Sequence, residues 1–171
     1  MNLLEFQSQY TRVQEAESRI AKKDTLEELA AMILEAVPHF KIRERNYYTS
    51  TSEIDLIVEN KHIHSALNSP SRYILVECKN WSEPVGSSEI RDFSVKIKRA
   101  QSNSGILFVK EGISGQSSGR DEGAVQEITD VFKDDGISIV VFGEKELNLI
   151  REGMSFYKLL DKKLFDLGFD H

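Results

Sequence analysis

Three charged residues lie in segments whose composition is typical of β-strands. Asp55 lies in EIDLIVE, and Glu77 and Lys79 lie in RYILVECK. In an extended strand, residues two apart project from one face, so Glu77 and Lys79 share a face and Cys78 points to the other. If the two strands pair as a hairpin, Asp55 can reach the same place. Two carboxylates and a lysine on an apolar sheet are costly to bury unless they pair or bind a cation.

A hard divalent cation would supply that compensation. Magnesium takes oxygen ligands, usually one or two carboxylates, and keeps several waters that substrate phosphates can replace. A bound ion would lower the pKa of a water and stabilise a pentavalent phosphate, while Lys79 would orient the nucleophile or offset developing negative charge. The pattern therefore indicates a metal-dependent phosphodiesterase. A Glu-x-Lys pair alone also arises on solvated strand faces, so the prediction depends on Asp55 and the strand context.

The elements that must position these residues begin with two predicted helices. Residues 2–22 have the sparse apolar spacing of a moderately amphipathic helix. A second helix follows, because Asp24 can cap it, with Glu27 three residues later in a capping box, and Pro38 marks its end. Glu27 thus has a purely structural interpretation as half of that box.

Beyond residue 38 the period changes from helical to alternating. Three strands with short connections predict an antiparallel meander, the first two joined around residues 49–52. The sequence then predicts a helix in EIRDFSVKIKRAQ capped by Ser87 or Ser88, a buried strand in GILFV, a helix over residues 120–134, a buried strand in ISIVVFG, and two short helices split near Gly153. This order predicts one α/β domain, a mixed sheet with helices on both faces.

The composition agrees with a single soluble domain. The chain has 171 residues, of which 40% are hydrophobic and 29% charged, which excludes a disordered tail, a collagen-like fibre and a disulfide scaffold. Cys78 is the only cysteine, so no intrachain disulfide is available, and we expect a buried core thiol in a reducing setting. Neither a signal sequence nor an apolar run of about 18 residues is present, so we expect a cytoplasmic protein without membrane contact.

The net charge of −6 argues at first against nucleic acid as a partner. The charges are unevenly placed, however. Residues 61–110 hold eight basic and four acidic residues, an excess of four positive charges, and the rest of the chain has an excess of ten negative charges. Lys96, Lys98 and Arg99, in the helix after the third strand, either line a DNA channel or form a solvated face.

An Asp, a loop and then Glu-x-Lys at the end of a strand, within an αβββαβ order, resemble the PD-(D/E)xK nuclease superfamily and most closely its Mrr-like restriction endonuclease branch. EIDLIVEN is similar to the metal-binding strand of that family, and ILVECKNW to its catalytic strand with the following aromatic residue. The later segments EIRDF, GILFV, ISIVVF and KELNLI also fit, so the resemblance spans about residues 24–152. It implies a restriction-endonuclease-like fold.

Carried over by position, the resemblance makes Asp55 and Glu77 metal ligands, the Cys78 backbone carbonyl a third ligand, and Lys79 the catalytic lysine. The family often has a glutamate early in its first core helix, where this chain has Glu27. The implied cofactor is Mg²⁺, with Mn²⁺ as a substitute. His62 and His64 are expected to be surface histidines, because no Cys or further His lies near them in sequence.

The leading expectation is a metal-dependent endodeoxyribonuclease acting in restriction or defence against foreign or modified DNA. The alternatives are a catalytically inactive nuclease-fold module for DNA binding or protein assembly, and a ribonuclease using the same site. Cutting both strands needs two sites, so a homodimer is expected, and a protein partner supplying DNA specificity is a further expectation. The expected organisation is an N-terminal helical extension (1–23), a nuclease domain (24–152) and a C-terminal helix of the same globule (153–171).

Overall fold

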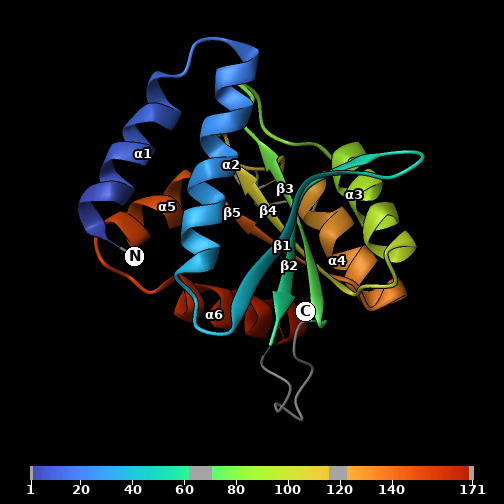
Figure 1. The fold of residues 1–171 in the computed structure, drawn as a ribbon. Coiled ribbons are helices and arrows are strands. Elements are labelled where there is room, and N and C mark those ends of the chain that lie inside the picture. Colours follow the sequence, from blue (N-terminus) through green and yellow to red (C-terminus); the bar gives the residue numbers. More distant parts are fainter. Residues whose placement is uncertain (1, 62–70, 116–122, 170–171) are drawn as a thin grey trace.

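The computed structural model describes residues 2–61, 71–115 and 123–169. Figure 1 shows a central sheet between two groups of helices. Within the described ranges, no helix combines the length and the apolar character that crossing a membrane requires. The elements in chain order are α1 (Leu3–Glu15), α2 (Arg19–Glu35), β1 (Phe40–Tyr48), β2 (Glu53–Asn60), β3 (Tyr73–Lys79), α3 (Ser87–Arg99), β4 (Ser104–Val109), α4 (Ala124–Asp135), β5 (Ser138–Phe142), α5 (Glu144–Arg151) and α6 (Phe156–Phe169).

The sheet has five strands in the order β1-β2-β3-β4-β5. The first three form an antiparallel meander, and β3, β4 and β5 run parallel to one another. The parallel pairs need crossovers, which α3 and α4 supply. The predicted α/β class is therefore confirmed, with an αβββαβ core that runs from α2 to β4.

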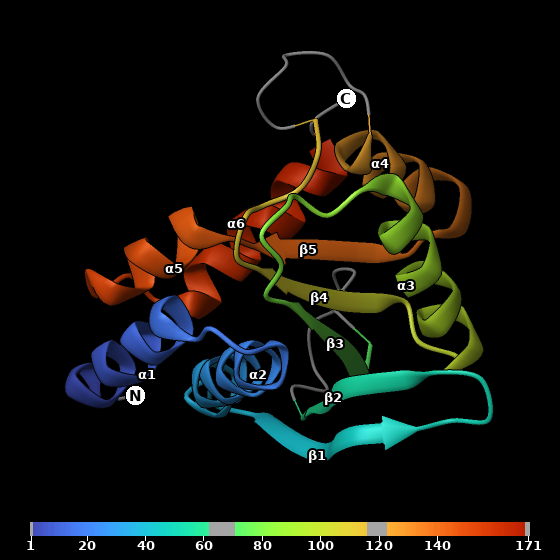
Figure 2. The same cartoon turned by 90° about the horizontal axis from the view of Figure 1, so that it is seen from above.

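Helices cover both faces of the sheet, as the view from above shows (Figure 2). On one face, α1, α2, α5 and α6 enclose a buried hydrophobic cluster that includes Phe6, Leu29 and Phe156, called the cluster under α2. On the other, α3 and α4 enclose a second hydrophobic cluster that includes Phe93 and Ile128, called the cluster under α3. Every residue of β4 is buried, because this strand lies between the two clusters. Charged groups that reach the sheet therefore need partners or a cation.

The second helix begins earlier than its sequence pattern predicts. Its N-cap is Ser18, whose Oγ accepts a hydrogen bond from the Ala21 N–H at 3.1 Å, and α1 already ends at Glu15. The predicted start at Asp24 is wrong, because the earlier serine caps one of the free N–H groups and the helix runs on without a break. Glu27 consequently lies in the helix interior and takes no part in a capping box.

Two further helix starts differ from their predictions. The N-cap of α3 is Gly86, so the predicted cap at Ser87 or Ser88 is wrong. The Gly86 N–H donates to Glu89 Oε2 at 3.0 Å, the bond that a glutamate three residues into a helix makes to its N-cap. Helix α4 begins at Ala124, and its expected start at residue 120 lies outside the described residues. The break between α5 and α6 occurs near Gly153, as predicted, where φ is 98°.

Strand β2 does not keep one alternation along its length. Leu56 and Val58 belong to the cluster under α2, as expected, but Ile54 belongs to the cluster under α3. The regular alternation of a strand would place all three on one side. The difference coincides with Asn46, which lies between the residues of β1 that pair with Leu56 and Ile54 and has a left-handed φ of 49°. The regular pleat is thus interrupted beside Asp55.

Candidate active site

Asp55 and Glu77 lie side by side where β2 and β3 separate. The antiparallel ladder between these strands ends at the pair Leu56 and Val76, and the two acids are the next residue on each strand. Asp55 Oδ2 accepts a hydrogen bond from the Cys78 N–H at 2.8 Å. Both acids are almost fully buried, with 5% of Asp55 and 3% of Glu77 exposed. The register therefore brings the two predicted carboxylates to one point.

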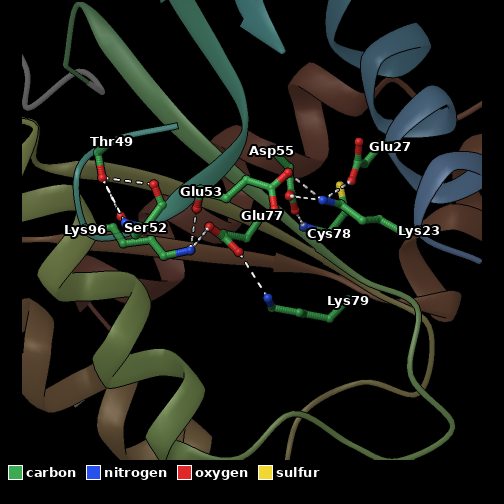
Figure 3. A network of polar contacts seen from close by, with 10 residues as sticks. All are labelled: Lys23, Glu27, Thr49, Ser52, Glu53, Asp55, Glu77, Cys78, Lys79 and Lys96. Atoms are coloured by element: carbon green, nitrogen blue, oxygen red, sulfur yellow. Dashed lines mark hydrogen bonds and ion pairs between the residues drawn. The ribbon is translucent and has the colours of Figure 1, made fainter. Parts of the chain in front are cut away.

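Both oxygens of Glu77 are held by lysines (Figure 3). Lys79 Nζ lies 3.1 Å from Oε2, as expected for residues two apart on one strand face. Lys96 Nζ, which comes from α3, lies 2.5 Å from Oε1 and donates to the backbone carbonyl of Glu53 at 2.7 Å. The site thus contains a second lysine from a different element.

Lys23 and Glu27 of α2 join these residues from the other side, and together they form what we call the carboxylate cluster. Lys23 Nζ lies 2.7 Å from Glu53 Oε1, 3.6 Å from Glu27 Oε1 and 3.7 Å from Asp55 Oδ1. Although burial opposes it, the hydrogen bond to Glu53 and the nearby carboxylates raise the pKa of Lys23. These contacts connect α2 to Glu53 and Asp55 of β2, next to the place where the alternation of that strand is interrupted.

Two of the acids are held in unfavourable surroundings. Burial and the charge of Asp55 raise the pKa of Glu27 to about 7, and Glu27 Oε1 is buried without a hydrogen-bond partner. Burial and the charge of Glu77 raise the pKa of Asp55 as well, despite the hydrogen bond from Cys78. Both shifts report an excess of negative charge in a region of low polarity.

The side chains of the carboxylate cluster are of the kind that binds a divalent cation. It contains four carboxylates, from Glu27, Glu53, Asp55 and Glu77, against the three ammonium groups of Lys23, Lys79 and Lys96. Glu27 Oε1 is buried without a hydrogen bond and the pKa of Asp55 is raised, and a cation would relieve both. Among the described residues, no three His, Cys, Asp or Glu side chains are already arranged to coordinate a metal.

Backbone geometry supplies a further oxygen. The N–H and C=O groups of one strand residue point to the same side, and the Cys78 N–H points to Asp55. The Lys79 carbonyl accepts instead from the Lys110 N–H of the chain following β4, at 3.2 Å, on the opposite side. The Cys78 carbonyl therefore faces the edge where Asp55 lies.

The thiol of Cys78 lies on the face of the sheet that α2 covers. It is buried in the cluster under α2, which confirms its interpretation as a core residue. Burial and the charge of Asp55 raise the pKa of the thiol well above its usual value. A thiol kept protonated in this way is a poor nucleophile.

The three basic residues expected either to line a DNA channel or to form a solvated face point to different places. Lys96 enters the carboxylate cluster, whereas Lys98 Nζ lies 2.5 Å from Asp135 Oδ2 of α4. Arg99 donates to Thr51 Oγ1 at 2.9 Å, in the turn between β1 and β2. Helix α3 thus reaches the hairpin with Lys96 and Arg99. His62 and His64 lie outside the described residues.

Sequence reasoning did not place Lys23, Glu53 or Lys96 in the cluster. Lys23 precedes Glu27 by four residues, a helical spacing that could have indicated it. Lys96 gave no such indication, because its contact with Glu77 depends on how α3 packs on the sheet. Asn46 is a further neighbour: with its amide nitrogen turned towards them, it donates to Glu27 Oε2 and Glu53 Oε1, at 3.2 Å each.

Comparison with protein families gives a match, which covers the part of the chain that carries the carboxylate cluster. A family described as "Restriction endonuclease" (Mrr_cat) matches residues 19–129, which include every residue of the cluster. No curated protein matches the chain.

Two solved structures are similar over part of their length. One is described as an EndoMS–dsDNA2 complex, with 12% identity, a TM-score of 0.38, and coverage of 68% of this chain and 43% of that one. The other is SfsA of Pyrococcus furiosus in complex with Ca²⁺, with 13% identity, a TM-score of 0.39, and coverage of 72% and 55%. The chain thus spans about half the length of these two proteins.

Proposed function

Because the chain belongs to the restriction endonuclease family that matches residues 19–129, we propose that it is a metal-dependent endodeoxyribonuclease. The observation that supports this most directly is the meeting of Asp55, Glu77 and Lys79 at the edge between β2 and β3. Its reaction would be hydrolysis of DNA phosphodiester bonds. A role in restriction or defence against foreign or modified DNA is part of the proposal.

The proposed ligands of the cation are Asp55, Glu77 and the Cys78 backbone carbonyl. Two carboxylates and a carbonyl suit Mg²⁺, with Mn²⁺ as a substitute, because these ions take oxygen ligands and leave positions for water and phosphate. When bound, such an ion lowers the pKa of a coordinated water and offsets charge on the phosphate. Burial of both acids supports the assignment, since a cation compensates what burial costs them.

Lys79 is the proposed catalytic lysine. Its ammonium is paired with Glu77 at 3.1 Å, yet 26% of its side chain is exposed, so a substrate phosphate can approach it. The Trp81 ring lies 5.4 Å from Nζ and limits where the ammonium can move. Lys79 would orient the attacking water or stabilise negative charge on the phosphate oxygens.

Glu27 is a further candidate for proton transfer. Its pKa of about 7 puts it half-protonated at neutral pH, where a carboxylate can accept a proton and a carboxylic acid can return one. Lys23 Nζ, at 3.6 Å, holds it on the side of Asp55. Its Oε1, buried without a hydrogen bond, supports a role beyond packing.

DNA is the proposed partner, with Lys98 and Arg99 as candidates for phosphate contacts. Both lie at the end of α3, and Lys98 is half exposed. A homodimer would supply the second site for cutting both strands, and an additional protein could add specificity. Cytoplasmic location is part of the same proposal.

A plasmid cleavage assay tests this function. The protein should nick or cut DNA with Mg²⁺ or Mn²⁺ and stop when EDTA is added, and Lys79→Ala should be inactive. Lys162→Ala is a matched control, because Lys162 is an exposed lysine of α6 paired with Asp166. Full activity of Lys79→Ala would refute the assignment. Unmodified DNA, methylated DNA and RNA in parallel would define the substrate.

A catalytically inactive DNA-binding or assembly module is the second candidate. It is favoured by the pairing of both Glu77 oxygens with lysines. Calorimetric titration with Mn²⁺ separates the two. The module requires no binding that depends on Glu77, whereas the nuclease requires it.

A further inference from the structure

The side chain of Lys96 contacts the carboxylate cluster, although Lys96 lies on α3, outside the strands that carry Glu53 and Glu77. Its Nζ lies 2.5 Å from Glu77 Oε1 and donates to the Glu53 carbonyl at 2.7 Å, so one ammonium bridges β2 and β3. Only 21% of the side chain is exposed. The charge is therefore directed into the protein rather than towards solvent (Figure 3).

Glu77 has no oxygen left without an ammonium group. Lys79 holds Oε2 at 3.1 Å and Lys96 holds Oε1 at 2.5 Å. Since Glu77 is 3% exposed, a cation that it ligates must share or take over one of these oxygens. Repulsion between that cation and a neighbouring ammonium is stronger here than in water, because the surroundings are less polar.

Of the two lysines, Lys96 is the more firmly anchored. It has a second bond, to a backbone carbonyl, and Arg99 one turn later donates to Thr51 Oγ1 at 2.9 Å. Helix α3 is thus held at two points to the hairpin formed by β1 and β2. The positive charge of Lys96 is therefore held beside Glu77 independently of Lys79.

We propose that Lys96 is a built-in counter-ion of Glu77 that competes with the divalent cation for this carboxylate. Its charge weakens metal binding and so sets the cation concentration at which the site becomes loaded. The inference rests on the proposed function, since it assumes that Glu77 is a metal ligand. Lys96 acts through Glu77 and is a positioning residue.

Calorimetric titration of the full chain with Mn²⁺ tests this role without any cleavage. Lys96→Met should bind Mn²⁺ about tenfold more tightly than the wild type, because a positive charge beside the ligand is removed. Lys96→Arg keeps the charge and should bind as the wild type does. Lys162→Met removes an exposed lysine of α6 by the same substitution and should also leave the affinity unchanged.

A second readout separates affinity from rate. In the cleavage assay, Lys96→Met should lower the Mg²⁺ concentration for half-maximal rate by a similar factor. Circular dichroism checks that each variant is folded. Lys96→Gln keeps a donor for the Glu53 carbonyl, and it should show the same tighter binding if Lys96→Met does not fold.

The outcomes distinguish this inference from the function on which it rests. Equal or weaker Mn²⁺ binding by a folded, uncharged variant would overturn the counter-ion role and leave Lys96 as a structural link between α3 and the sheet. Wild-type protein that binds no Mn²⁺, or binds it equally after Asp55→Asn, would overturn the proposed metal site and this inference with it.

Discussion

The carboxylate of Asp55 accepts a hydrogen bond from the backbone N–H of Cys78 at 2.8 Å. This contact fixes an acid of β2 to the backbone between Glu77 and Lys79 of β3. It also means that Asp55 has two roles, because its side chain satisfies a buried N–H as well as carrying charge. Substitutions can separate these roles.

Asp55→Asn should keep the fold and lose activity. The amide oxygen can still accept from the Cys78 N–H, whereas the charge proposed to hold a cation is gone. Asp55→Ala leaves that N–H without a partner and should lower the free energy of unfolding by about 1–3 kcal/mol. Urea denaturation compares the two variants. Equal stability of both would show that the hydrogen bond contributes nothing.

Lys79→Ala should lower the cleavage rate by about 100-fold or more, since a positioned charge near the phosphate is removed. Mn²⁺ binding should persist, because the proposed ligands Asp55 and Glu77 remain. Cleavage kinetics and calorimetry measure the two effects, with Lys162→Ala as the control. Loss of metal binding together with activity would indicate that Lys79 shapes the metal site rather than acting on the substrate.

Glu27→Gln should stabilise the metal-free protein most at high pH. The folded pKa of about 7 lies above the ordinary 4.5, so the contribution of Glu27 to stability is most favourable below pH 4.5 and is lost as the pH rises through 7. The advantage of the amide should therefore grow across this window, by on the order of 3 kcal/mol. Urea denaturation in EDTA from pH 4.5 to 8 measures it.

Glu28→Gln is the matched control for that series. Glu28 follows Glu27 in α2 but is half exposed, with Arg12 as its partner at 3.0 Å. Its substitution makes the same chemical change at an exposed position of the same helix. A difference between Glu27→Gln and wild type that does not change with pH would contradict the raised pKa.

Addition of Mn²⁺ should stabilise the wild type against unfolding and leave Asp55→Asn unaffected. At a free concentration 100-fold above the dissociation constant, the gain is about 2.7 kcal/mol, because the ion binds only the folded state. Thermal melts with Mn²⁺ and with EDTA test this. Equal stabilisation of both proteins would place the ion elsewhere.

Gly105→Ala should destabilise the protein through contacts between β4 and α3. A methyl group at this position would lie 2.5 Å from Ile97 Cδ1 and 2.8 Å from Phe93 Cε1, both in the buried cluster under α3. Overpacking of this kind costs about 1–3 kcal/mol. Gly136→Ala is a poor control because φ there is 65°, so Gly168→Ala, with open space around it, is preferred. Unchanged stability of Gly105→Ala would show that α3 can shift freely.

Much of the fold could be predicted from local patterns. The alternating segments around Asp55 and Glu77 predicted a hairpin, and the two-residue spacing of Glu77 and Lys79 predicted their common face. Both follow from strand geometry alone. The order of helices and strands then fixed the α/β class, because parallel strands need helical crossovers.

What could not be predicted depends on contacts between distant segments. Lys96 reaches Glu77 across 19 residues only because α3 packs on β4, and Lys23 reaches Glu53 across 30. The early start of α2 was missed because Ser18 and Asp24 are both good caps, and local sequence does not choose between them. The change of face at Ile54 was missed because it coincides with a left-handed residue, Asn46, on the neighbouring strand.

The net charge of the carboxylate cluster decides whether an approaching phosphate is repelled or attracted. When Glu27 carries a proton, below pH about 7, the remaining carboxylates of Glu53, Asp55 and Glu77 are balanced by the three lysines. The surplus negative charge of the chain then lies elsewhere, and beyond roughly 8 Å it is screened at physiological ionic strength. A strand of DNA would meet a locally neutral surface, and each divalent cation held there would make it attractive.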